Sequence, residues 1–113
     1  MIQFEIPVKT VSESNQREHW AAKHRRTKAL RETAAMFAGQ WRNQAPKKIR
    51  SIRMTRVTGK RGKMLDVGNL AVALKAVQDG ICDALGIDDG DARIEWTYDQ
   101  FKGDDWGVEV EIS

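Results

Sequence analysis

The feature that most constrains the fold is a change of hydrophobic period along the chain. Four short stretches alternate apolar and polar residues, and two long stretches repeat every three to four residues. Alternation is typical of half-buried strands, and the longer period is typical of amphipathic helices. The prediction is one α/β (α+β) domain spanning residues 1–113, with β-α-β-α-β-β order and two helices packed on a small mixed sheet.

Turn and breaker residues set the bounds of these elements. Strands are predicted over residues 2–6, 49–58, 94–98 and 106–112, and helices from capping side chains within 12–15 to about 40 and from about 69 to 85. Pro46 forbids continuation of the first helix, and Gly86 is suited to end the second. The KGDD turn between the last two strands predicts a hairpin. The TGKRGK stretch, residues 58–63, is expected to form a mobile glycine-containing loop.

The two halves of the chain carry opposite charge. Residues 1–63 hold 16 of the 19 Lys and Arg and 4 of the 16 Asp and Glu, whereas residues 64–113 hold 3 basic and 12 acidic residues. A cationic surface gathers phosphates because binding releases their condensed counterions. A carboxylate cluster repels phosphates unless a divalent metal lies between them. The alternative is that the halves attract each other across the fold or a dimer interface, and charge alone does not decide between the two.

Composition argues against membrane and secreted classes of protein. No apolar run approaches the roughly 20 residues of a membrane span, so no membrane partner is expected. The stretch MIQFEIPVKT lacks the basic start and apolar run of a secretory signal. Cys82 is the single cysteine, so an internal disulfide and a multi-cysteine zinc site are excluded. A cytoplasmic protein is expected.

Acidic residues flank the second predicted helix. Asp66 lies just before it, and Asp88, Asp89 and Asp91 lie just after it. The two flanking loops of a helix lie at its opposite ends, so bringing Asp66 near Asp88 or Asp89 requires a segment that runs back along the helix. Magnesium prefers such hard oxygen ligands. The alternative is that IDDGD is a solvated turn, and these residues by themselves favour the turn.

Lys75 and Asp79 share a face of the same helix because they are four residues apart, with Asp83 one turn further. A lysine beside a scissile phosphate stabilises charge in the transition state. An ordinary surface ion pair is the more usual role of two such residues.

Other chemistry-bearing side chains point to structural roles. His19 and His24 are five residues apart, about 140° around a helix, and make a poor metal pair. Cys82 has no evident histidine or acidic partner and is expected to be a small buried residue. The four tryptophans follow apolar periodicities, so core or dimer-interface positions are expected before base stacking.

The stretch LDVGNLAVALKAVQDGICDALGIDDGD, residues 65–91, resembles the core of the RusA family of crossover-junction endodeoxyribonucleases, especially its prophage-encoded branch. That family has an Asp-x-Asp-Asn-Leu segment, a helix with Lys and then Asp-Gly or Asp-Ala, and a later Asp-Asp pair. The matching positions are Asp66, Asn69, Leu70, Lys75, Asp79, Gly80, Asp88 and Asp89. Upstream, NQREHWAAKHRRTKALR is similar to the family's N-terminal segment, so the resemblance covers nearly the whole chain.

This resemblance implies a RusA-like homodimer that resolves Holliday (four-way) junctions or related branched DNA by paired phosphodiester hydrolysis. The implied cofactor is Mg²⁺, with Mn²⁺ as a substitute. Asp66 and Asp89, with Asp88 beside it, match the metal-binding catalytic carboxylates. Lys75 matches the basic catalytic helper, and Asp79 matches an acidic position with a supporting catalytic role.

Gly68 departs from the family pattern, because DVGN stands where Asp-x-Asp-Asn is expected. Removing one member of a set that acts as a unit can remove most of an activity. The alternative function is therefore a non-catalytic DNA-junction-binding protein with a degenerate metal site, and a third is a structural dimerisation protein. In either DNA-binding case the backbone contacts are expected from Arg25, Arg26, Lys28, Arg53, Arg61 and Lys63.

Overall fold

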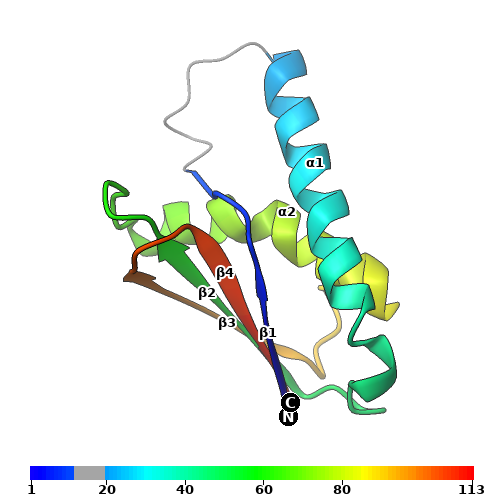
Figure 1. Cartoon of the computed structure of the whole chain (residues 1–113). Helices are drawn as coiled ribbons and strands as arrows, with labels where there is room; N and C mark the ends of the chain where they lie inside the picture. Colours follow the sequence, from blue (N-terminus) through cyan, green and yellow to red (C-terminus); the bar gives the residue numbers. More distant parts are fainter. Residues whose placement is uncertain (12–19) are drawn as a thin grey trace.

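The computed structural model describes residues 1–11 and 20–113 (Figure 1). Its elements are β1 (Ile2–Ile6), α1 (Trp20–Gly39), the short 3-10 helix η2 (Arg42–Gln44), β2 (Ser51–Thr58), α2 (Val67–Leu85), β3 (Glu95–Lys102) and β4 (Gly107–Ile112). This order confirms the predicted α+β domain with two helices and a four-stranded mixed sheet. The predicted helix cap at 12–15, and His19, lie outside the described residues.

The strand order of the sheet is β1-β4-β2-β3. β4 pairs antiparallel with β1 and with β2, whereas β2 and β3 are parallel. The predicted hairpin between the last two strands is therefore wrong, because β2 lies between β3 and β4. The chain crosses the end of β2 instead, where the Gly103 amide donates to the Thr58 carbonyl oxygen at 2.9 Å.

Burial explains this strand order. β2 and β4 are the most buried strands and occupy the two central places. β3 exposes Asp99, Phe101 and Lys102 and takes an edge, where unpaired backbone groups meet water. A short turn indicates that the chain reverses direction, and it does not determine which strand becomes the neighbour.

The sheet has an apolar face that both helices cover. Side chains alternate between the two faces of a strand, and the apolar face carries Ile6, Ile52, Met54, Val108, Val110 and Ile112. The predicted apolar stripe of α2 packs against it through Leu70, Leu74, Val77 and Ile81. In Figure 1, α2 crosses the strands and the first half of α1 extends past the sheet. Trp20 lies in that extending half and is 74% exposed.

The opposite face of the sheet is polar and acidic. Its alternate strand positions include Glu5, Glu95, Asp99, Glu109 and Glu111. Arg53 is also on this face, opposite Glu111 in the register of β2 and β4. An acidic surface repels phosphate, so this side of the protein disfavours nucleic acid.

Local signals fix the ends and the packing of α2. Asp66 is its N-cap, and Gly86 follows its last turn with φ of 67°, in the left-handed region that favours glycine. Within the helix, a Cβ on Gly80 would lie 2.3 Å from the carbonyl oxygen of Arg31 in α1. The missing side chain therefore lets the two helices approach closely. Among residues 1–11 and 20–113, no helix has the length and apolar character needed to cross a bilayer.

The loop between β2 and α2 is packed against Trp106. A Cβ on Gly59 or on Gly62 would come within 2.8 Å of that ring. The guanidinium carbon of Arg56 and the Nζ of Lys9 each lie 5.2 Å from the ring centroid. The stretch predicted as a mobile loop thus has an aromatic ring against its two glycines.

Candidate functional site

The Lys75 ammonium lies between two carboxylates on the surface of α2. Its Nζ is 2.5 Å from Asp89 Oδ2 and 3.0 Å from Asp79 Oδ1. The contact with Asp79 confirms that these two residues share a helix face. Asp89 arrives from the loop after α2, because the turn at Gly86 sends the chain back along the helix. We refer to Lys75, Asp79 and Asp89 as the Lys75 cluster.

Lys75 and Asp89 hold each other in their charged forms. The hydrogen bond to Asp89, followed by that to Asp79, raises the pKa of the Lys75 ammonium above its ordinary value. The Lys75 ammonium lowers the pKa of the Asp89 carboxyl. The side chains of Lys75 and Asp89 are 55% and 33% exposed. A solvent-borne ligand can therefore reach both charges.

Two other acidic residues of this loop shape its turns. Asp88 Oδ1 accepts the Gly90 amide at 2.9 Å, and Asp91 Oδ1 accepts the Arg93 amide at 3.0 Å. The Arg93 guanidinium also donates to both Asp91 oxygens, and these bonds lower the pKa of the Asp91 carboxyl to about 2. The turn interpretation of IDDGD therefore holds for Asp88 and Asp91, whereas the Asp89 side chain contacts α2.

Asp66 lies apart from the Lys75 cluster. Its two carboxylate oxygens accept the Asn69 amide at 2.8 Å and the Asn69 side-chain nitrogen at 3.0 Å. Lys75 follows nine residues later, roughly 13 Å along the helix axis. The structure therefore does not bring Asp66 together with Asp89, although the acidic loop does run back along the helix.

Gly68 faces open space beside Asp66. A Cβ at this position would meet Asp66 Oδ1 at 3.7 Å, an ordinary contact, and no other atom within 4 Å. Position 68 precedes Lys75 by seven residues, or two helical turns, and so lies on the same face of α2. An aspartate would therefore fit at 68, and its carboxylate would lie between Asp66 and the Lys75 cluster.

Asp79 and Asp89 can together hold a divalent cation. Each has an oxygen within 3.0 Å of the same nitrogen atom. Protein-bound Mg²⁺ often uses one or two carboxylates, with phosphate and water completing its shell. Across residues 1–11 and 20–113, no three His, Cys, Asp or Glu side chains are grouped to hold a metal ion. The donors thus fit a two-carboxylate site at which Lys75 gives way, and they do not fit the implied Asp66–Asp89 pair.

Cations of α1 border the Lys75 cluster. A hollow of about 220 Å³ between the two helices is lined by His24, Thr27, Lys28, Arg31, Ala76 and Asp79. Arg31 is fixed there by two hydrogen bonds to the Asp83 carboxylate, of 2.6 and 2.9 Å. Lys28 has a distant partner in Glu32, at 3.9 Å. A phosphate group in this hollow would meet nitrogen donors of three kinds beside Asp79.

The predicted DNA-contacting residues divide into three places. Arg25, Arg26 and Lys28 lie on α1, and Arg61 and Lys63 lie in the loop that leads to Asp66. Arg53 stands alone on the acidic face of the sheet. Its odd-numbered position in β2 points it away from the helices, since Ile52 and Met54 point inward. The helix and loop residues can act on one ligand, whereas Arg53 lies on the other face of the sheet.

Arg56 and Gln100 hold the loop that leads to Asp66, and the sequence-based prediction included neither. Arg56 is 2% exposed and donates to Thr10 Oγ1, to the Thr10 carbonyl oxygen and to the Lys63 carbonyl oxygen, each at 3.0 Å. Gln100 Oε1 accepts the Leu65 amide at 3.0 Å, and its Nε2 donates to the Leu65 carbonyl oxygen. These bonds fix the loop directly before Asp66. The sequence carried a signal for both residues, because each is polar at a strand position whose side chain points inward. The two are partners in the register of β2 and β3.

Cys82 is buried, as expected from the sequence. Its side chain is 8% exposed. Burial raises the pKa of the thiol to about 11, and the charges of Asp89 and Asp79 act in the same direction. The thiol is therefore protonated at neutral pH and is a poor nucleophile.

We expect the Cys82 thiol to react with DTNB at pH 8 at least about tenfold more slowly in the folded protein than in urea-unfolded protein. The free energy of unfolding should also fall as pH rises from about 8.5, where the unfolded thiol ionises, to about 11, where the folded thiol does. Cys82→Ser supplies the control, since it should lose the thiol titration. Equal DTNB rates for folded and unfolded protein would contradict the burial of this group.

Comparison of the chain with protein-family models, with curated proteins and with solved structures found no match. The site consists of carboxylate oxygens that can hold a divalent cation and of neighbouring nitrogen donors that can hold a phosphate. Both lie on the helix layer, and the acidic face of the sheet lies on the other side.

Proposed function

We propose that this protein is a metal-dependent endonuclease of the RusA type that resolves Holliday junctions or related branched DNA as a homodimer. The observation that carries the proposal is the Lys75 cluster beside the cationic helix α1, on the side of the molecule opposite the acidic sheet face. The family resemblance and the unequal charge of the two halves of the chain support it. A cytoplasmic location, in a bacterial or phage-infected cell, would follow from a DNA substrate.

The surface charge orients the substrate. DNA phosphates are attracted to α1, where Arg25, Lys28 and Arg31 are exposed, and are repelled by the carboxylates of the outer sheet face. Arg61 and Lys63 extend the basic surface to the start of α2. The backbone therefore passes across the helix layer, and contacts of this kind recognise junction shape and not sequence.

In the proposed chemistry the two carboxylates and the ammonium of the Lys75 cluster have separate roles. Asp79 and Asp89 would hold the cation through oxygen atoms, and a bound Mg²⁺ supplies polarisation of the phosphate and a more acidic attacking water. The Lys75 ammonium leaves the two carboxylates and donates to the scissile phosphate, where it stabilises the added negative charge. Arg31, held by Asp83, and His24 bind the neighbouring phosphate in the hollow.

Cleavage of a labelled, immobile four-way junction should require Mg²⁺, with Mn²⁺ substituting, and give paired cuts. Asp89→Asn should reduce the cleavage rate at least about a hundredfold while junction binding persists, because only the carboxylate charge is removed. Asp66→Asn tests the second family position without loss of the helix cap, since asparagine caps as well as aspartate. Because the Asp66 carboxylate lies apart from the Lys75 cluster, Asp66→Asn should reduce the cleavage rate far less than Asp89→Asn does.

The matched control is Asp99→Asn, the same chemical change on the acidic face of the sheet. Its cleavage rate and its urea-unfolding midpoint should equal those of the unaltered protein. A cleavage rate that survives Asp89→Asn would contradict the nuclease proposal.

The second candidate function is a junction-binding protein without nuclease activity. The open space at Gly68 favours it, because the carboxylate expected there is missing for no steric reason. This candidate predicts tight junction binding with no cuts by the natural chain, and Mg²⁺-dependent cuts by Gly68→Asp. Under the leading proposal, Gly68→Asp changes an activity that is already present.

A further inference from the structure

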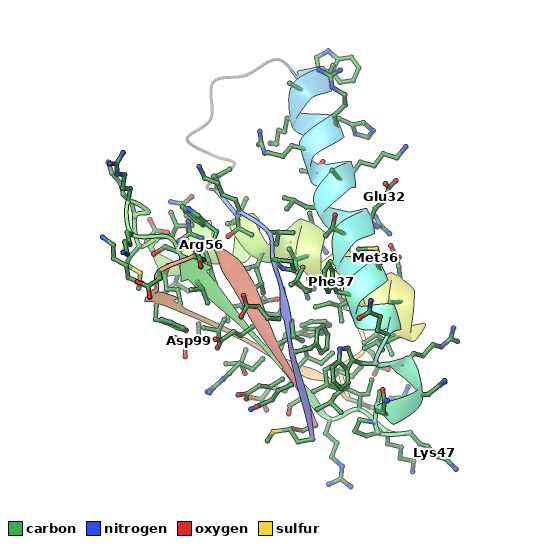
Figure 2. All side chains as sticks on the ribbon, in the orientation of Figure 1. Glu32, Met36, Phe37, Lys47, Arg56 and Asp99 are labelled. Carbon is green, nitrogen blue, oxygen red and sulfur yellow. The ribbon has the colours of Figure 1, made fainter. Side chains whose placement is uncertain are left out.

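A second basic surface lies beyond the end of α2, away from Asp66. Here a groove of about 920 Å³ opens between residues 42–50, which include η2, and the loop that follows α2. Its volume is within the range of ligand clefts in proteins, about 300 to 1,000 Å³. Its cationic lining residues are Arg42, Lys47, Lys48, Arg50 and Arg93. In Figure 2, Lys47 extends from this end of the molecule.

Most of the groove's positive charge is unneutralised. Within the part of the chain that the structure describes, no carboxylate pairs with Arg42, Lys47, Lys48 or Arg50. The acidic lining residue, Asp91, has both oxygens bound by Arg93 at 3.0 and 2.8 Å. Like charges gathered in one concave surface repel one another. A bound polyanion removes that repulsion and gains from released counterions.

Aliphatic side chains form the floor of the groove, and backbone hydrogen bonds hold its walls in place. Ile49, Leu85 and Ile87 are half-buried there, and Ile94 is buried. Backbone bonds hold the basic segment, since the Arg50 amide donates to the Ser113 carbonyl oxygen at 2.7 Å and the Glu95 amide donates to the Arg50 carbonyl oxygen at 2.9 Å. A cationic rim over an apolar floor suits a ligand that has phosphates on one side and sugars and bases on the other.

The loop that follows α2 contributes to both the groove and the candidate site. Asp89 of the Lys75 cluster lies between two lining residues, Ile87 and Asp91. We propose that the groove holds a short single-stranded segment of DNA that continues from the phosphate bound at the Lys75 cluster. This inference rests on the proposed function. Because a duplex keeps its bases paired inside the helix, contact between the bases and the aliphatic floor of the groove requires an unpaired strand.

The test measures anisotropy of a fluorescein-labelled 15-nucleotide single strand between 50 and 200 mM NaCl, using the full chain. In Lys47→Gln/Lys48→Gln, affinity at 50 mM NaCl should fall about tenfold, and the slope of log affinity against log salt should become shallower by about 1.4. The matched control, Arg53→Gln/Lys102→Gln, removes the same charge elsewhere and should change neither quantity by a comparable amount.

The outcomes test single-strand binding in the groove independently of the proposed nuclease function. If the two double variants had equal affinity and equal salt slope, single-strand binding in the groove would be contradicted, even if the protein cuts junctions. Competition by poly-glutamate as effective as by unlabelled DNA would also overturn it, because it would assign the groove to acidic peptides. A loss of single-strand affinity confined to the groove variant would support binding in the groove. If the unaltered protein then showed neither junction preference nor cleavage, only the proposed nuclease function would be contradicted.

Discussion

Gly80→Ala should destabilise the protein by about 2 kcal/mol, although alanine is the better helix former by about 1 kcal/mol. The added Cβ would lie 2.3 Å from the Arg31 carbonyl oxygen, 2.7 Å from Ala34 Cβ and 3.0 Å from the Ala35 nitrogen. Two of these atoms belong to the backbone of α1, so no side chain can rotate away. The helices must separate, and overpacking of this kind costs about 1 to 3 kcal/mol or more. Urea unfolding and a fall in Tm of about 10 °C would report it.

Gly39→Ala is the matched control for this prediction. Gly39 is the last residue of α1, it has no atom within 4 Å of an added Cβ, and its φ is not in the left-handed region. The same substitution should therefore be neutral or slightly stabilising. A Gly80→Ala protein as stable as the Gly39→Ala protein would show that the two helices are not held this closely. Gly80→Val should be worse than Gly80→Ala, because its branched side chain enlarges the same clash.

The elements of the fold were predictable because each has its own periodic signal. The stripe from Leu70 to Ile81 and the alternation in β2 and β4 identify a helix and two strands without knowledge of their neighbours. Strand order has no such local signal. The turn between β3 and β4 resembles a hairpin connection, and competition for the buried centre of the sheet places β2 between them.

The candidate site was predictable only in part, for a similar reason. The spacing of Lys75 and Asp79 places them on one helix face, and Gly86 predicts where α2 ends. The return of Asp89 to Lys75 depends on the path of the chain after Gly86, which spacing does not encode. Arg56 and Gln100 could have been predicted, because a polar residue at an inward strand position breaks the alternation of apolar and polar residues. Such a break can be recognised in the sequence.

Arg56→Met should reduce the free energy of unfolding by about 4 kcal/mol. Methionine keeps most of the buried side-chain volume and removes the guanidinium, which leaves the Thr10 carbonyl oxygen, Thr10 Oγ1 and the Lys63 carbonyl oxygen without their donor. Each buried polar group left unpaired costs about 1 to 3 kcal/mol. Burial lowers the pKa of the Arg56 guanidinium, and the three hydrogen bonds together with the Trp106 ring at 5.2 Å offset the cost of burying this cation.

The loss should loosen the loop before α2, because Arg56 (labelled in Figure 2) joins β2 to Thr10 and to the Lys63 carbonyl oxygen. Tryptophan fluorescence from Trp106 should therefore change below the unfolding transition. Arg53→Met is the matched control, since it makes the same replacement on the exposed face of the same strand and should cost less than about 0.5 kcal/mol. Equal stability of the two variants would mean that the buried guanidinium does not fasten these loops. A large difference would show that one cation inside the fold holds both Thr10 and the Lys63 segment that leads to Asp66.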